Sequence, residues 1–173
     1  MLNWKNIPPF IAICVLALFA TTGDAAEMAR EFSRFSVELP AGWDGEEKTG
    51  FVSDNPDEYL LTLGKTDAGG DEILAQISVY ILPNVNAVSA ADAARRLAEA
   101  QGGSDEPRRE GVLWTFTGEP RTKIIKGRAV TYANATPEKM LIIIAQDPKN
   151  LGAAEILASL RGLDQESAAL LGR

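Results

Sequence analysis

Residues 139–145, with the sequence KMLIIIA, are the most apolar strand-length segment after the first 25 residues, and they decide the fold class. A strand with one face in water alternates apolar and polar residues, whereas this segment is apolar from Met140 onward. Such a run is typical of a strand that is covered on both faces. It therefore predicts a central strand, around which the rest of a sheet is arranged.

Shorter segments on the N-terminal side of this run supply the other expected strands. Phe35, Val37 and Leu39 alternate with polar residues, as in a half-buried strand. Further strands are expected at residues 51–52 (part of a strand or its end), 59–63, 73–82, 112–117, 123–125 and 129–133. A polar turn at residues 67–71 separates two of these segments, so residues 59–82 predict a hairpin.

Two segments have helical periodicity instead. Residues 89–101 begin with Ser89 and Asp92, a pair that resembles a capping box. The apolar stripe of this segment is mostly alanine, which predicts a helix lying close against the sheet. A second helix is expected at about residues 151–161, and residues 164–173 extend it or fray.

The order of these elements is three or four strands, a helix, about three strands and a helix. No internal repeat or linker divides the chain, and its 173 residues, 46% apolar and 24% charged, have an ordinary globular composition. We therefore expect a single α+β domain at residues 26–173, with an antiparallel sheet of six to seven strands and two main helices packed on it.

The first 25 residues have the three parts of a secretory signal peptide. A polar start that carries Lys5 precedes the apolar run 10–20, and Gly23 and Ala25 occupy the small-residue positions of a cleavage site. The apolar run is shorter than the roughly 20 residues that a transmembrane helix needs. We therefore expect cleavage after Ala25, a periplasmic or secreted mature protein, and no stable membrane span in that mature form.

Cysteine and histidine usage narrows the possible chemistry. Cys14 is the only cysteine, and it lies inside the apolar run after Ile13 rather than at the cleavage position, so we interpret it as a signal-peptide residue and not a lipidation site. The mature chain then has no disulfide. The chain contains no histidine, which excludes Ser-His-Asp and Cys-His catalysis and histidine-ligated zinc.

Residues 48–55, KTGFVSDN, contain two signatures of the serine β-lactamases and penicillin-binding enzymes, K-T-G and S-D-N. Their order is reversed, they lie too close together, and no serine begins the S-x-x-K motif of those enzymes. We interpret residues 53–57 as a turn. Asp67, Asp71 and Glu72 suggest two hypotheses, a Ca²⁺ site or a polar hairpin turn, and because their spacing is not that of an EF-hand loop we interpret them as the turn. We expect no catalytic, cofactor-binding or metal-binding residues.

The phrase FSVELPAGW at residues 35–43 begins a longer pattern: an acidic stretch, a hairpin, a helix, a W-x-F segment, a second hairpin and a final helix. This pattern resembles the PsbP-like fold, which includes the photosystem II extrinsic subunit and the DcrB-like bacterial envelope proteins. The resemblance covers about residues 32–162, and it implies a binding or assembly module rather than an enzyme. Its shared positions are structural, namely Phe35, Leu39, Pro40, Gly42 and Trp43. DcrB-like proteins are commonly lipid-anchored, and Cys14 is misplaced for that here.

Charge is distributed unevenly along the chain. Residues 41–80 hold nine acids and two lysines, a net charge of −7, whereas residues 107–140 hold seven basic residues and three acids, a net charge of +4. Solvated strand faces and loops would explain this pattern, and so would a face that docks a protein. The net charge of the whole chain, −7, argues against a nucleic-acid partner.

Four basic residues, Arg121, Lys123, Lys126 and Arg128, lie within eight positions on or beside an expected strand. A regular strand would divide them between its two faces, whereas a bend at Gly127 could bring them to one edge. Such charge can simply protect an edge strand from pairing with other sheets. The alternative is that this patch docks an acidic protein of the envelope.

The sequence therefore predicts an exported, non-enzymatic envelope protein that acts as a binding or assembly module and needs no cofactor. The alternative is a small hydrolase or lyase that uses carboxylate or lysine chemistry without histidine or cysteine.

Overall fold

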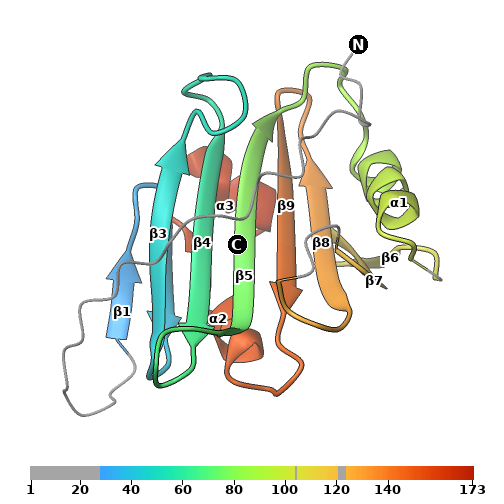
Figure 1. Cartoon of the computed structure of the whole chain (residues 1–173). Coiled ribbons are helices and arrows are strands. Elements are labelled where there is room, and N and C mark those ends of the chain that lie inside the picture. The colour runs from blue at the N-terminus through green and yellow to red at the C-terminus, as the bar shows by residue number, and fades with distance from the viewer. Residues whose placement is uncertain (1–27, 104, 121–123) are drawn as a thin grey trace.

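The computed structural model describes residues 28–103, 105–120 and 124–173. Its main element is an antiparallel sheet of seven strands in the order β3-β4-β5-β9-β8-β7-β6 (Figure 1). The strands are β3 Trp43–Thr49, β4 Tyr59–Thr66, β5 Ile73–Pro83, β6 Arg108–Glu110, β7 Leu113–Gly118, β8 Ala129–Ala135 and β9 Lys139–Gln146. The expected α+β class with a large antiparallel sheet is confirmed.

Strand β9 has the central position that its apolar run predicts. It lies between β5 and β8, and Ile143 is opposite both Val79 of β5 and Tyr132 of β8. Side chains on both of its faces are buried: Leu141 and Ile143 point into one core, and Met140 and Ile142 into another. The β4–β5 hairpin is also confirmed.

The first core lies between the large sheet and a layer that contains a second, smaller sheet. This small sheet consists of β1 Met28–Glu31, β2 Phe35–Leu39 and β10 Arg161–Gly162, in the order β1-β2-β10. Helices α2, Ala153–Ser159, and α3, Gln165–Leu171, lie on the same face of the large sheet (Figure 1). Side chains from these elements meet the large sheet in one cluster, which includes Phe35, Tyr59, Leu61, Ile156 and Leu170.

Helix α1, Ala90–Ala100, covers part of the opposite face, across β7 and β8. Ala93 and Ala94 are fully buried there, so the helix backbone approaches the sheet closely, as its alanine stripe predicts. The Ser89 hydroxyl accepts a hydrogen bond from the backbone N–H of Asp92 at 3.1 Å, which confirms the expected cap.

Three expectations about the elements are wrong. Residues 164–173 neither extend the final helix nor fray, because α2 ends at Ser159 and the Asp164 carboxylate caps a separate helix α3 by accepting from the N–H of Ser167 at 2.7 Å. Residues 51–52 lie in a turn, and the strand expected there is β3, further toward the N-terminus. Ile124 and Ile125 lie in bends rather than in a strand.

Within the described residues, the helices are all too short or too polar to cross a membrane. The expected signal peptide, with Lys5, Cys14 and the cleavage position at Ala25, lies outside the described residues, as do Arg121 and Lys123 of the predicted basic patch.

Candidate functional site

The connection between β7 and β8 carries the described part of the predicted basic patch. Ile124, Lys126 and Arg128 are exposed, whereas Ile125 between them is 6% exposed. Gly127 has a φ of +124°, a conformation that favours glycine, and the chain bends there as expected. We call residues 124–128 the basic loop.

A buried glutamine holds the basic loop in place. Gln146, at the end of β9, is 7% exposed, and its side-chain Nε2 donates to the carbonyls of Ile125 at 3.2 Å and Gly127 at 3.4 Å. These carbonyls bond a side chain, and residues 124 and 125 lie in bends instead of the expected strand. The only sequence signal was a polar residue at the end of an otherwise apolar run.

The K-T-G and S-D-N signatures lie in or beside the β3–β4 loop, which a buried carboxylate organises. Glu58 is 5% exposed and accepts hydrogen bonds from the N–H groups of Val52 and Ser53, at 2.8 and 3.1 Å, and from the Ser53 hydroxyl at 2.5 Å. Burial acts to raise the pKa of Glu58, but the hydrogen bonds from Ser53 and Val52 outweigh it and the pKa is lowered. Ser53 therefore faces a weak base, and the loop is the turn that the sequence predicts.

A second group of polar side chains bears on the enzymatic alternative. The Oε2 atom of Glu47 accepts hydrogen bonds from the hydroxyls of Ser33 and Tyr59 and from the N–H of Ser33, each at 2.8 Å. A serine that donates to a carboxylate has the arrangement of a nucleophile with its base. Desolvation acts to raise the pKa of Glu47, yet the bonds from Ser33 and Tyr59 outweigh it, so the pKa is lowered and the carboxylate is a poor base.

The same group links the large sheet to the layer formed by the small sheet and α3. Burial, followed by the contact with Glu47, raises the pKa of Tyr59, so this phenol keeps its proton. Arg34 lies over the Tyr59 ring, 5.9 Å from its centroid, and pairs with Glu166 of α3 at 2.7 Å. These contacts link the β1–β2 turn to β3, β4 and α3, and we interpret them as structural.

The acidic β4–β5 turn uses its first carboxylate internally. Asp67 Oδ1 accepts from the N–H groups of Asp71 at 2.8 Å and Glu72 at 3.1 Å, and these backbone bonds lower the pKa of Asp67. This bonding agrees with a polar hairpin turn. In the part of the chain that the structure describes, no three acidic or cysteine side chains are grouped so that they could hold a metal ion.

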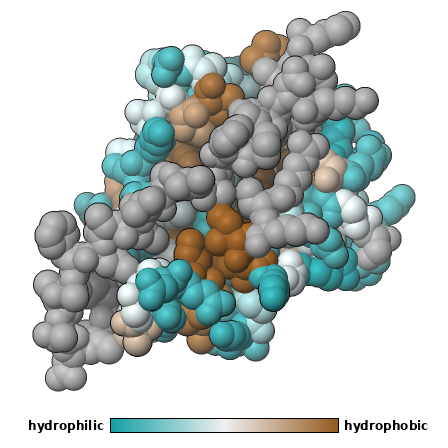
Figure 2. Space-filling view, viewed as in Figure 1, coloured by the Kyte–Doolittle hydropathy of each residue, from teal (hydrophilic) through white to brown (hydrophobic). Residues whose placement is uncertain are grey.

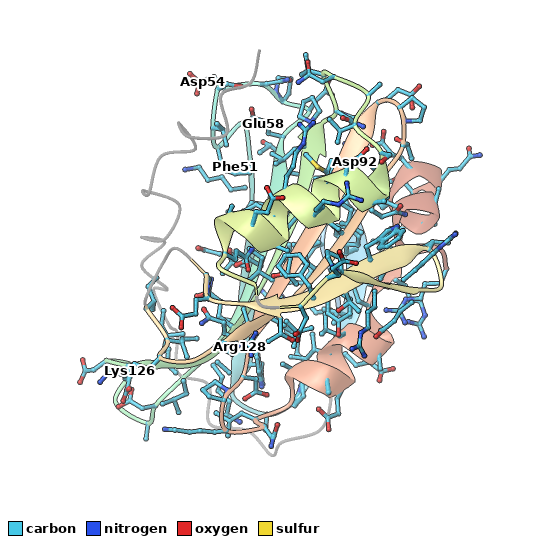
Figure 3. All side chains as sticks on the ribbon, turned by 90° about the vertical axis from the view of Figure 1, so that its right-hand side faces the viewer. Phe51, Asp54, Glu58, Asp92, Lys126 and Arg128 are labelled. Carbon is cyan, nitrogen blue, oxygen red and sulfur yellow. The ribbon has the colours of Figure 1, made fainter. Side chains whose placement is uncertain are left out.

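The uneven charge of the sequence becomes a difference across the sheet. Residues 41–80 form strands β3 to β5 on one side of β9, and residues 107–140 contribute β6 to β8 on the other side. Figure 2 shows hydrophobic surface near the middle of the face turned away from α2 and α3, with hydrophilic residues below it. In Figure 3, Asp54 and Glu58 lie at one end of the molecule, and Lys126 lies toward the other.

No family model, curated protein or solved structure matches this chain.

Proposed function

We propose that this protein is an exported, non-enzymatic module of the cell envelope, periplasmic or secreted, that binds an acidic protein partner through the basic loop. The observation that carries the proposal is the contrast between the backbone and the side chains of this loop. Gln146 and the buried Ile125 hold its backbone on the end of β9, while Ile124 (41% exposed) and Lys126 face solvent. Arg128 is also exposed, and its Nη2 donates to the carbonyl of Thr117 at 3.0 Å.

A loop of this kind is suited to protein docking. A backbone that is already ordered loses little conformational entropy when a partner binds, so more of the contact energy appears as affinity. The exposed cations would steer an acidic partner and fix its orientation, and Ile124 would supply apolar contact. Arg121 and Lys123 add positive charge to the same connection in the sequence.

Two further observations support a protein partner. The chain as a whole has a net charge of −7, which disfavours a nucleic acid. The resemblance to PsbP-like proteins, which the sequence carries in FSVELPAGW and the elements that follow, also implies a binding or assembly module.

The test is charge reversal in the basic loop. Lys126→Glu combined with Arg128→Glu should abolish capture of the partner from the envelope fraction, because two attractive charges become repulsive. Capture by the parent chain should weaken as salt rises. The matched control is Arg95→Glu with Arg96→Glu, which makes the same charge change on the exposed side of α1 and should leave capture intact.

Circular dichroism and a thermal melt would establish that both variants fold. If the loop variant folds and still recovers every partner of the parent, the charges only keep the protein soluble and the proposed function is wrong.

A further inference from the structure

Three loops meet at the end of the sheet opposite the basic loop. They are the β3–β4 loop at residues 50–58, the β5–α1 loop at residues 84–88 and the β8–β9 turn at residues 136–138. The strand register brings them together, because Tyr59 pairs with both Thr49 and Ile81, and Pro83 pairs with Lys139. We call this the three-loop end.

The three-loop end exposes apolar side chains among acids. Val85 is 75% exposed and Val52 is 46% exposed. Asp54, Asp57 and Glu138 are exposed carboxylates on the same loops. Lys139 is 9% exposed and forms an ion pair with Asp57 at 3.4 Å, so these two charges offset each other. Together with the adjoining strand residues 48–49 and 139, these loops hold four acids and two lysines, a net charge of −2.

Buried polar side chains hold these loops in fixed shapes. Glu58 organises the first loop, as described above. Asn84 is 6% exposed, and its Nδ2 donates to the carbonyls of Val88 at 2.9 Å and Thr136 at 2.7 Å, which joins the other two loops. Asp54 and Ala87 have φ values of +55° and +46°, a region that non-glycine residues rarely adopt. Such backbone persists only where the surrounding contacts enforce it, so the exposed valines stand on ordered loops.

The basic loop and the three-loop end therefore carry opposite charges. The basic loop presents Ile124, Lys126 and Arg128, with a net charge of +2, and the three-loop end presents Val52 and Val85 with a net charge of −2. They lie at opposite ends, because the basic loop leads into β8, where Val130 pairs with Ala145 near the end of β9, whereas the three-loop end lies where β9 begins. One molecule cannot join its own two ends, but two molecules can.

We infer that the acidic partner of the basic loop is a second copy of this chain, which receives Ile124 and Lys126 on its three-loop end. This inference rests on the proposed function, since it names the partner of the same loop. The contact is heterologous, because two different surfaces meet, and a bound pair leaves one basic loop and one three-loop end unoccupied. The assembly therefore grows end to end into short chains instead of closing at a dimer.

Charge also sets the orientation of this contact. The β4–β5 turn lies at the same end of the sheet as the basic loop and carries Asp67, Asp71 and Glu72. The three-loop end of an incoming copy is repelled by that turn and attracted by the basic loop, so it is directed toward the β8 side of the sheet.

Sedimentation velocity tests the inference. The protein is expressed with its own N-terminal segment and purified from the compartment that it reaches. The parent should form species larger than a dimer as concentration rises, and added salt should shift it toward monomer. Two variants each remove one surface. Lys126→Glu with Arg128→Glu reverses the charge of the basic loop. Asp54→Asn with Val85→Ser and Glu138→Lys disrupts the surface of the three-loop end. Asparagine tolerates the left-handed backbone at position 54.

Each variant alone should remain monomeric, because it has only one working surface. An equimolar mixture of the two should form a 1:1 dimer and nothing larger, since one variant supplies the three-loop end and the other the basic loop. The control Arg95→Glu with Arg96→Glu should associate like the parent.

Cysteine pairing tests the geometry independently. Cys14 is the only native cysteine, so both chains carry Cys14→Ser. Val85→Cys in one chain and Ile124→Cys in the other should then form a mixed disulfide. The control Leu163→Cys, at another exposed apolar position, should not pair with Ile124→Cys.

A parent that stays monomeric at every concentration, or association that neither variant reduces, would overturn the inference. If the parent is monomeric and the loop variant nevertheless loses an envelope partner in the capture experiment, the proposed function stands and that partner is a different acidic protein.

Discussion

The two faces of the seven-stranded sheet are covered in different ways. On the face of α2, α3 and the small sheet, large side chains such as Phe35, Tyr59 and Leu61 fill the space between layers. On the face of α1, the contact is made largely by alanine, with Ala93 and Ala94 fully buried and only Leu97 supplying a long side chain from the helix core positions.

The two faces should therefore respond differently to substitutions that remove side-chain atoms and to substitutions that add them. Burial of a large apolar side chain contributes about 1.5–3 kcal/mol. The core on the side of α2, α3 and the small sheet, which we call the thick core, should therefore lose most stability when side-chain atoms are removed. The alanine contact has little to lose by truncation, but it has no room for added atoms because interiors are close-packed.

Removal of Trp43 should have the largest effect. Its side chain is 6% exposed in the thick core, and its Nε1 donates to the carbonyl of Leu151 at 2.7 Å. We expect Trp43→Ala to cost about 3–5 kcal/mol, out of the roughly 5–15 kcal/mol available to a domain. Urea denaturation would measure this loss. Trp114→Ala, at a half-buried tryptophan packed against the α1 core, is the matched control and should cost less; equal losses would contradict the comparison.

An added side chain under α1 should have the next largest effect. Ala94 is completely buried (0% exposed) between helix α1 and the sheet. Ala94→Leu should cost about 1–3 kcal/mol through overpacking. Ala100→Leu, at an exposed position of the same helix, should change stability little. If Ala94→Leu is neutral or stabilising in urea denaturation, the contact is looser than described.

Loss of the α1 cap should have a smaller effect. Ser89→Ala leaves the N–H of Asp92 without its hydroxyl partner and should cost about 1 kcal/mol. Ser89→Asn, which retains a capping oxygen, should restore most of the loss. Hydrogen exchange would locate the change: faster exchange in α1 but not in α2 or α3 is expected, and uniform acceleration would show that the two faces do not respond separately.

Acid should slightly lower the free energy of unfolding through Glu47, which lies on the side of the thick core. Its pKa is lowered in the folded chain, so its contribution to stability is complete above its unfolded pKa and is lost as pH falls through the folded value. Free energies of unfolding measured from pH 7 to pH 3 should fall less steeply in Glu47→Gln than in the parent. The exposed Glu38→Gln is the control, and an unchanged slope in Glu47→Gln would show that Glu47 does not contribute.

Elements with a local signal were predicted well. The hairpin β4–β5, helix α1 with its cap at Ser89 and the central strand β9 were all expected within a few residues. Strand β3 was misplaced because its sequence, WDGEEKT, is mostly polar and lacks the alternation of a half-buried strand. Its identity depends on pairing with β4, which no local pattern reports.

For the candidate site, the sequence identified the charged residues but not the buried polar residues that hold the loops in place. Lys126 and Arg128 were named from their spacing, yet the strand expected beside them is a bent loop, and neither Gln146 nor Glu58 was recognised as the residue that organises a loop. Each makes its bonds only after distant segments have met, as Gln146 does with Ile125, 21 residues away.

Local patterns were thus enough to predict the class of fold, the central strand, the helix against the sheet and the charge carried by each segment, because periodicity, caps and charge are properties of neighbouring residues. Contacts between distant segments place β2 in a separate small sheet, since Ser36 pairs with Arg161 far along the chain. They also place the basic loop and the three-loop end at opposite ends of the large sheet. The physical reason is that strand order and register arise from burial and hydrogen bonding between segments remote in sequence, and no short stretch of the chain contains that information.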